Sequence, residues 1–295
     1  MKLGLGTVQF GLDYGITNRS GRTPLAEVRR ILADAGRKGI DTLDTAALYG
    51  NAESVLGQAL PRPHKFSIIT KTLALEPAAD GNAAIATVVD GALGSLERLG
   101  ESRLAGLLIH RIGDLLGPTG DALYAALEGL RSAGKYDRIG VSVYTPEEAY
   151  AVLDRYPIDL IQLPLNPLDQ RHLRLGSLAA LQAAGVEIHV RSAFLQGLLL
   201  SAAPALPPGL AGLASPLAAW RTALQECELT GLQGCLGFLK GVDACSVVVC
   251  GATTLAEWQE IVAAFETAAP MPPDALKNLA VQDDKLIDPR YWSRH

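Results

Sequence analysis

Short apolar runs alternate with helix-like segments eight times along the chain, and this alternation restricts the fold more than any other sequence feature. The expected strands are residues 2–7, a run ending at 44, 66–71, 104–110, 139–142, 160–163, 187–191 and 246–250. Between and after them, apolar residues recur at helical spacing in segments 24–38, 52–59, 83–99, 121–133, 145–155, 175–184, 217–227, 232–239 and 255–264. The segment at 145 opens with Thr145 and Pro146, a helix-capping pattern.

Eight strand and helix pairs predict an α/β fold, a (β/α)8 TIM barrel that closes as a single domain. A length of 295 residues suits one such barrel, and no Pro-rich or Ser/Gly-rich linker divides the chain into two halves. A doubly wound sheet is the weaker alternative. It would need a Gly-x-Gly-x-x-Gly turn after the first strand, which the sequence around Gly4 and Gly6 lacks.

In a (β/α)8 barrel, functional residues lie at the carboxyl ends of the strands. All eight expected strands end in a polar residue or a glycine: Thr7, Asp44, Lys71, His110, Ser142, Gln162, Arg191 followed by Ser192, and Gly251. In a barrel with only a structural role, we would expect apolar residues at some of these ends. Together with Tyr49, five residues after Asp44, the set contains the groups needed to move a proton.

The residues Asp44-Thr-Ala-x-x-Tyr49-Gly50, Lys71 and His110 resemble the catalytic tetrad of the aldo-keto reductases, and the likeness covers nearly the whole chain, 1–295. It implies an NAD(P)-dependent oxidoreductase, similar to bacterial aldo/keto reductases and sugar dehydrogenases, that interconverts a carbonyl and an alcohol by hydride transfer. A phenol ordinarily has a pKa of about 10. In the implied roles, Tyr49 donates the proton, the Lys71 ammonium lowers the pKa of the phenol, Asp44 holds Lys71, and neutral His110 orients the carbonyl oxygen.

The resemblance also implies a nicotinamide cofactor, NADP(H) or NAD(H), bound across the barrel mouth. Ser142 and Gln162 are similar to the family residues that hold its carboxamide, and 192–199 resembles the family's pyrophosphate loop. The segment 251–254 resembles the adenosine-phosphate site at a helix N-terminus. The cofactor-binding residues implied are Gly6, Thr7, Ser142, Gln162, Arg191, Ser192, Phe194, Gly197, Gly251, Thr253, Thr254 and Glu257.

Three positions depart from the family pattern. No Lys or Arg lies within 253–257, where NADPH-dependent members usually pair the 2′-phosphate, and Glu257 would repel it; this favours NADH without deciding between the two cofactors. Val143 stands where Asn often follows Ser142. Arg191 replaces the usual aromatic residue, and it either stacks on the nicotinamide, binds an acidic group of the substrate, or forms a salt bridge in the barrel mouth.

Composition narrows the partners and the compartment. The net charge is −5 with no block of like charges, so nucleic acid is not an expected partner. The four cysteines form no C-x-x-C pair, so we expect no metal site and no disulfide framework. We see no signal peptide and no apolar run near the roughly 20 residues that cross a membrane, and we expect a cytoplasmic protein without a membrane partner. The oligomeric state is not readable.

The substrate is constrained only broadly. Loops 111–119 and 198–215 and the tail 282–295 are expected to wall the pocket, and Tyr291 and Trp292 either lie over it or pack outside the barrel. Aromatic content of 5% disfavours steroid or aryl pockets, so sugars or small polar aldehydes are the expected substrates. Two alternatives stay open: a nucleotide-binding sensor or auxiliary subunit with little turnover, and an isomerase or aldolase using Lys71 as a Schiff base.

Overall fold

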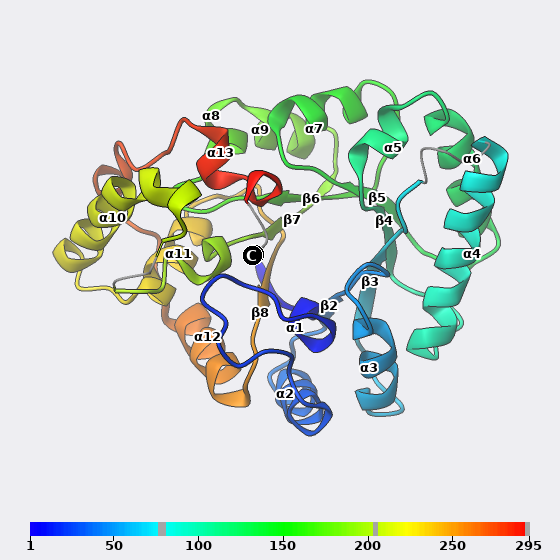
Figure 1. The fold of residues 1–295 in the computed structure, drawn as a ribbon, viewed down its shortest axis with the longest axis horizontal. Coiled ribbons are helices and arrows are strands. Elements are labelled where there is room, and N and C mark those ends of the chain that lie inside the picture. The colour runs from blue at the N-terminus through cyan, green and yellow to red at the C-terminus, as the bar shows by residue number, and fades with distance from the viewer. Residues whose placement is uncertain (76–80, 203–205, 293–295) are drawn as a thin grey trace.

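The computed structural model describes residues 1–75, 81–202 and 206–292 and contains a closed barrel of eight parallel strands (Figure 1). Each strand pairs with the next, and β8 pairs with β1. The predicted (β/α)8 fold is confirmed. The strands are β1 Lys2–Gly6, β2 Thr42–Asp44, β3 Ser67–Lys71, β4 Gly106–Ile109, β5 Ile139–Ser142, β6 Leu160–Pro164, β7 Glu187–Arg191 and β8 Val247–Gly251.

Helices surround the barrel and cover the outside of every strand (Figure 1). The α-helices are α1 Val8–Gly11, α2 Leu25–Arg37, α3 Ala52–Ala59, α4 Gly81–Leu99, α5 Ile112–Leu116, α6 Gly120–Ser132, α7 Pro146–Leu153, α8 Arg171–Arg174, α9 Ser177–Ala183, α10 Ala214–Glu226, α11 Gly231–Lys240, α12 Leu255–Thr267 and α13 Asp284–Ile287. Four 3-10 helices are η1 Leu195–Gly197, η2 Pro208–Leu213, η3 Pro273–Leu276 and η4 Pro289–Tyr291.

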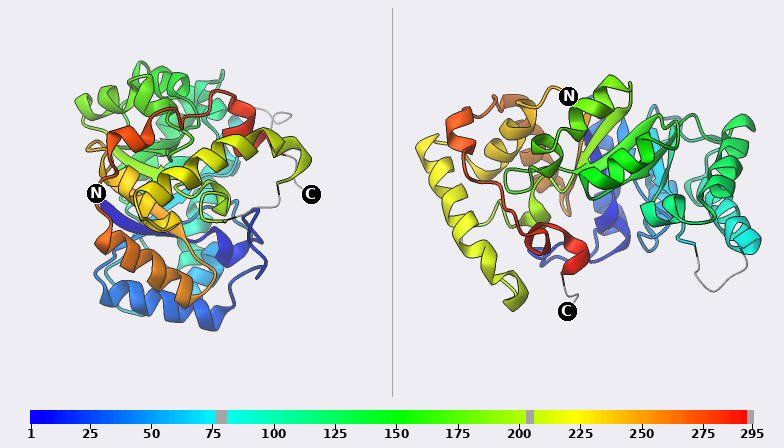
Figure 2. Two further views of the ribbon diagram at one scale, coloured as in Figure 1. Left: turned by 90° about the vertical axis from the view of Figure 1, so that its left-hand side faces the viewer. Right: turned by 90° about the horizontal axis from the view of Figure 1, so that it is seen from above.

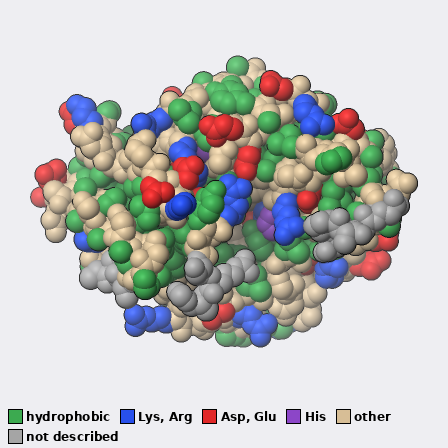
Figure 3. Space-filling view, turned by 45° about the horizontal axis from the view of Figure 1, so that its top comes forward, with side chains coloured by type: hydrophobic (Ala, Val, Ile, Leu, Met, Phe, Trp, Pro, Cys, Tyr) green, Lys and Arg blue, Asp and Glu red, His purple; other side chains and the backbone are tan. Residues whose placement is uncertain are grey.

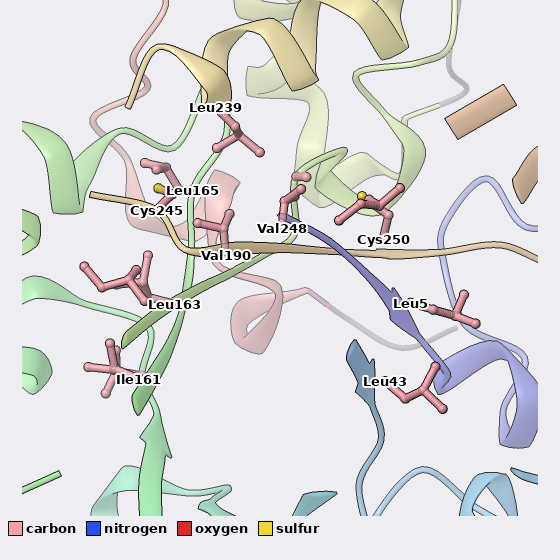
Figure 4. Packing of buried hydrophobic residues seen from close by; sticks show 14 of the residues in the cluster. Leu5, Leu43, Ile161, Leu163, Leu165, Val190, Leu239, Cys245, Val248 and Cys250 are labelled. Atoms are coloured by element: carbon pink, nitrogen blue, oxygen red, sulfur yellow. The ribbon is translucent and has the colours of Figure 1, made fainter. Parts of the chain in front are cut away.

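Side chains alternate between the two faces of each strand, and the outward set forms the main core. Leu5, Leu43, Ile161, Val190 and Val248 are fully buried and belong to one large apolar cluster with residues of the surrounding helices (Figure 4). Burial of this kind contributes about 25 cal/mol per Å² of apolar surface removed from water. The main stabilising layer therefore lies between the barrel and its helices.

The inward face has a smaller apolar cluster of its own, formed by Ile69, Leu108 and Leu160. A Cβ atom added at Gly140 would lie only 2.1 Å from the Leu160 carbonyl oxygen, so glycine lets the strands approach closely there. Because the side-chain period of a strand is two, the residue two positions further on faces inward as well. The residues two positions after Ile69, Leu108 and Leu160 are Lys71, His110 and Gln162, respectively.

Some elements differ from the sequence prediction in length or presence. The strand expected from 104 begins at Gly106, because Leu104 forms only an isolated bridge to Tyr136. Helix α5 occupies part of the expected loop 111–119, and η2 and the start of α10 occupy part of the loop 198–215. Residues 203–205 of that loop and 293–295 of the expected tail lie outside the described residues.

The C-terminal elements lie at the mouth of the barrel. Figure 2 shows α13 and η4 on the side of the molecule opposite the N-terminus, where β1 begins. The parallel strands therefore run toward these elements. Within the described ranges, no helix combines the length and the apolar character that a membrane span requires.

Candidate active site

A buried ion pair between Lys71 and Asp44 lies at the centre of the site. Lys71 ends β3 and Asp44 ends β2, so the parallel sheet brings them to the same rim. The Lys71 Nζ lies 2.8 Å from each Asp44 carboxylate oxygen and 2.9 Å from the Thr45 carbonyl oxygen. These acceptors take all three N–H donors of the ammonium. Lys71 therefore has one fixed position and no donor left for another hydrogen bond.

Tyr49 and His110 flank this pair. The Lys71 Nζ lies 4.8 Å from the centre of the Tyr49 ring, and the His110 ring meets Tyr49 edge-on at a centroid distance of 5.8 Å. The short helix α1 holds the Tyr49 loop closely: a Cβ atom at Gly11 would be 1.9 Å from the Tyr49 carbonyl oxygen. On the other side of that contact, Gly50 has a φ of +59°, which glycine adopts without strain. The structure thus brings together the four residues expected to act in catalysis.

The acidity of Tyr49 differs from the sequence expectation. Burial, and then the negative charge of Asp44, raise the pKa of the Tyr49 hydroxyl well above its ordinary value, and the cation that opposes this shift is Arg191. Lys71 acts on the ring face by its charge, which Asp44 largely neutralises, so the expected lowering of the phenol pKa does not appear. The hydroxyl is therefore held in its protonated form.

The two nitrogen bases also have shifted pKa values. Burial lowers the pKa of His110 to about 3, and the charges of Lys71, Arg191 and Arg111 act in the same direction. Its imidazole is therefore neutral at physiological pH. Burial lowers the pKa of Lys71 as well, and the Asp44 carboxylate opposes that shift by its charge and hydrogen bonds. We take Lys71 to be an ammonium because both carboxylate oxygens contact it.

Gln162 offers an acceptor that fits an amide-bearing cofactor. Its Nε2 donates to Asp44 Oδ1 at 2.7 Å, which orients the side chain, while its Oε1 is buried with no partner among the described residues. Buried polar atoms without a partner are uncommon in folded proteins. Ser142, at the neighbouring position of β5, is buried beside it, and Thr7 donates its hydroxyl to the Asp44 carbonyl oxygen. The donor and acceptor set fits a carboxamide group.

Arg191 packs against Tyr144 and not against a carboxylate. Its guanidinium carbon lies 3.9 Å from the centre of the Tyr144 ring, and its Nη2 donates to the Val143 carbonyl oxygen at 2.9 Å. On the other side, Arg290 lies 4.0 Å from the same centre, so Tyr144 is held between two guanidinium groups. Across the residues the structure describes, Arg191 forms no salt bridge, which was one of the three roles considered for it.

The loop after β7 is tightly turned and contains several residues with positive φ angles. Ser192, Leu195 and Gln196 all have positive φ angles, and the Phe194 side chain packs partly buried against the core. Gly197 has a φ of +89°, and a Cβ atom there would lie 1.9 Å from Thr17 Oγ1. Close packing of this residue against Thr17, in the loop after α1, thus explains why position 197 is a glycine. Whether backbone N–H groups here hold a pyrophosphate stays a prediction.

The expected adenosine-phosphate site lies at the start of α12. Gly251 pairs with Gly6 in the sheet, and Thr254 caps the helix by accepting from the Glu257 N–H. The Glu257 carboxylate is turned back onto this turn, where one oxygen accepts from both the Thr253 N–H and hydroxyl at 2.7 Å. Glu257 is therefore engaged with its own helix start. A hollow of about 360 Å³ beside it is lined by Arg22, Glu27, Thr253 and Thr254, among others.

A pocket of about 440 Å³ opens directly beside His110 and Ser142. Loop 111–119 and the tail contribute Arg111 and Arg290 to its wall, as expected, whereas no described residue of 198–215 lines it. Tyr144 and Glu148 were not expected there from the sequence. Neither Tyr291 nor Trp292 lines it, and Tyr291 is 60% exposed. Figure 3 shows a hollow in which a histidine side chain is visible between basic side chains on both sides. Glu148 forms the capping box of α7 with Thr145, and only the fold brings it to the pocket.

Chemically, the arrangement can give a proton to an oxygen atom placed beside Tyr49 and His110, and His110 also lines the pocket. The protonated phenol lies next to both the neutral imidazole and the fixed ammonium. Within the described residues, no group of three or more His, Cys, Asp or Glu side chains is placed to hold a metal ion.

Comparison with known proteins gives consistent results. A family model described as "Aldo/keto reductase family" matches residues 2–279. Among solved structures, an aldo-keto reductase from Bacillus halodurans in its holo form is similar, with 26% identity, a TM-score of 0.76, and coverage of 96% of this chain and 93% of that chain. A protein from Pseudomonas aeruginosa assigned to the aldo-keto reductases shares the fold, with 23% identity, a TM-score of 0.66 and 90% coverage of each chain. Among curated proteins, no sequence matches.

Proposed function

The chain belongs to the aldo/keto reductase family, whose members reduce carbonyl compounds with NAD(P)H, and on this premise we propose that it interconverts a small polar carbonyl compound and its alcohol with Tyr49 as proton donor and acceptor. One observation carries the proposal. The Lys71 ammonium, bound by both oxygens of Asp44, faces the Tyr49 ring at 4.8 Å beside a neutral His110.

The proton step follows from these groups. When bound, the reduced nicotinamide supplies the hydride. His110 orients the carbonyl oxygen by a hydrogen bond, and as that oxygen gains negative charge the proton passes to it from the Tyr49 hydroxyl. The phenolate left behind is stabilised by the charge of Arg191. The raised pKa of free Tyr49 keeps the proton in place until the oxygen becomes basic enough to take it.

The Gln162 Oε1 atom, buried and without a described partner, would accept from the cofactor carboxamide, with Ser142 beside it. At the other end, we propose that NADH is preferred to NADPH. Two carboxylates already occupy the start of α12: Glu27 accepts from the Leu255 N–H and Glu257 from Thr253. A 2′-phosphate placed there would be repelled by both negative charges, whereas an uncharged ribose hydroxyl would not be repelled.

We expect fluorescence titration to give a dissociation constant at least about tenfold lower for NADH than for NADPH, because a like-charge contact of this kind costs on the order of 1 kcal/mol or more. Substitution Glu257→Gln should reduce the difference between the dissociation constants for NADH and NADPH. Arg22 lines the same hollow and is the residue that would instead pair with the 2′-phosphate of NADPH. Tighter NADPH binding that is lost in Arg22→Gln would contradict the proposed preference.

The proposed substrates are sugars or small polar aldehydes and ketones. The pocket beside His110 combines Arg, Glu, Ser and Tyr side chains with apolar Ile112 and Leu116, which suits a hydroxylated molecule of modest size. The direction of the reaction in the cell depends on the substrate and cofactor supply, so oxidation of an aldose at its anomeric carbon belongs to the same proposal.

Consumption of NADH and NADPH with a panel of sugars and small aldehydes tests the function. We expect turnover with at least one carbonyl compound, and a loss of roughly 10³-fold or more in kcat in Tyr49→Phe, which keeps the ring but lacks the proton. Nucleotide binding should be retained in that variant. Tight nucleotide binding without turnover of any compound would instead support the sensor or auxiliary-subunit alternative.

A further inference from the structure

Arg111 is a charged pocket residue whose guanidinium donors have no partner among the described residues. It follows His110 at the end of β4 and lines the pocket with His110 and Ser142. Its guanidinium donates no hydrogen bond to, and forms no ion pair with, any residue in 1–75, 81–202 or 206–292. A guanidinium has five N–H donors in a planar fork that matches the two oxygens of a carboxylate or phosphate. Arg111 is thus free to bind such a group.

The other charged groups of the pocket wall are already engaged. Arg290 is bound by Asp288 and, at 2.9 Å, by Glu148, whose second carboxylate oxygen accepts from the Tyr144 and Thr145 N–H groups. Asp114 accepts from the Leu75 N–H at 3.0 Å; burial raises its pKa, and this hydrogen bond and the charge of Arg111 oppose the shift without an ion pair between Asp114 and Arg111. Arg111 is therefore the charged lining residue best able to take up a ligand.

The position beside His110 also favours an anion. Three cations, Lys71, Arg191 and Arg111, act on the His110 imidazole, and their effect is visible in its low pKa. Asp44 neutralises Lys71, but Arg191 and Arg111 have no carboxylate hydrogen-bonded to them among the described residues.

We propose that the carbonyl substrate carries an oxyanion group, a carboxylate or a phosphate, and that Arg111 binds it while the carbonyl oxygen faces Tyr49 and His110. This inference rests on the proposed function. The pocket of about 440 Å³ has room for a small compound with both groups. Arg111 would then decide which carbonyl compounds are good substrates without taking part in proton transfer.

Two matched substrate pairs test the proposal: succinic semialdehyde against butanal for the carboxylate, and glyceraldehyde 3-phosphate against glyceraldehyde for the phosphate. In the wild type, we expect kcat/KM for the anionic member of one pair to exceed that of its neutral partner about tenfold or more. In Arg111→Gln, this ratio should fall about tenfold or more, chiefly through KM. The pair that responds identifies the anionic group.

Arg103→Gln is the matched control. Arg103 precedes β4 as Arg111 follows it, so the substitution removes the same charge at the opposite end of the same strand, and its partner Asp137 is in an exposed pair of little energetic weight. The control should keep the wild-type ratio. Equal preference for both members of both pairs, or a ratio that Arg111→Gln leaves intact, would overturn the proposal.

If the proposed function itself is wrong, we expect a different result: none of the four compounds leads to consumption of NADH or NADPH. Calorimetric titration with 4-hydroxybutanoate, glycerol 3-phosphate and butanol then tests Arg111 without turnover. Binding of an anionic compound that Arg111→Gln weakens and Arg103→Gln does not would still support an anion site. No binding of either anion, or binding indifferent to Arg111, would contradict it.

Discussion

At the scale of single residues, the most constrained group is the Lys71 ammonium, whose side chain is 1% exposed. All three of its donors are satisfied by Asp44 and Thr45, and Asp44 is held in turn by Gln162. A buried ion pair is seldom a net source of stability, because desolvation offsets the attraction, but breaking it leaves one charge buried alone. The pair is therefore better explained by the proton chemistry beside it than by folding.

Substitution Asp44→Asn should lower the free energy of unfolding by roughly 3 kcal/mol, because Lys71 would lose its buried counter-charge. Urea unfolding followed by circular dichroism measures this. The double variant Asp44→Asn with Lys71→Met should recover part of the loss. Asp137→Asn, in the exposed pair with Arg103, is the control and should cost no more than about 1 kcal/mol. A loss no larger in Asp44→Asn than in this control would contradict the argument.

The sequence allowed the positions of these residues to be predicted, but not their interactions. Polar strand ends placed Asp44, Lys71 and His110 at one rim, because parallel strands share their direction. The complete use of the Lys71 donors and the raised pKa of Tyr49 depend on distances that no local pattern contains. Glu148 was not placed at the pocket, because its partner Arg290 lies 142 residues away in the chain.

At the scale of secondary-structure elements, the short helix α1, which has only four residues, fixes the loop that carries Tyr49. It presses on the loop between β2 and α3, with the Gly11 backbone against the Tyr49 carbonyl and the Ala52 N–H. The position of the Tyr49 ring therefore depends on an element that belongs to a different strand–helix unit. Helices of this length contain too few residues for an apolar periodicity, which is why the sequence did not predict it.

Gly11→Ala tests this contact. A Cβ atom 1.9 Å from the Tyr49 carbonyl oxygen forces the loop to move, so we expect kcat to fall and the free energy of unfolding to decrease by about 1–3 kcal/mol. Turnover and urea unfolding are the measurements. Gly129→Ala is the matched control, since nothing lies within 4 Å of its Cβ position in α6, and it should stabilise the helix by up to about 1 kcal/mol. Unchanged kcat and stability in Gly11→Ala would show that the loop has room.

At the scale of the whole molecule, two histidines with lowered pKa values, the partly buried His110 and the fully buried His172, couple stability to pH. Burial lowers the pKa of both His110 and His172 to about 3, and the positive charge of Arg171 adds to the effect on His172. The unfolded chain takes up these protons near pH 6.5, whereas the folded protein takes them up only near pH 3. Their contribution is complete above pH 6.5 and is lost progressively as the pH falls toward 3.

We therefore expect the free energy of unfolding to fall between pH 6.5 and pH 4, with each histidine adding at most about 1.4 kcal/mol per pH unit to the slope. Substitution His172→Asn should reduce that slope while carboxylate titration remains the same in both proteins. Urea unfolding at half-unit pH intervals gives the comparison. Parallel curves for the wild type and the variant would show that His172 titrates normally.

The hydrogen bond from Gln162 to Asp44 joins residues 118 positions apart in the chain. During synthesis, strands β2 to β4 leave the ribosome well before β6, so the carboxylate that fixes Lys71 lacks this support until more than half of the polypeptide is available. A nascent chain or a truncated fragment that ends before β6 would contain all four tetrad residues without the means to orient them. We therefore expect proton-transfer activity only after β6 has joined the barrel, and none from a chain that ends before it.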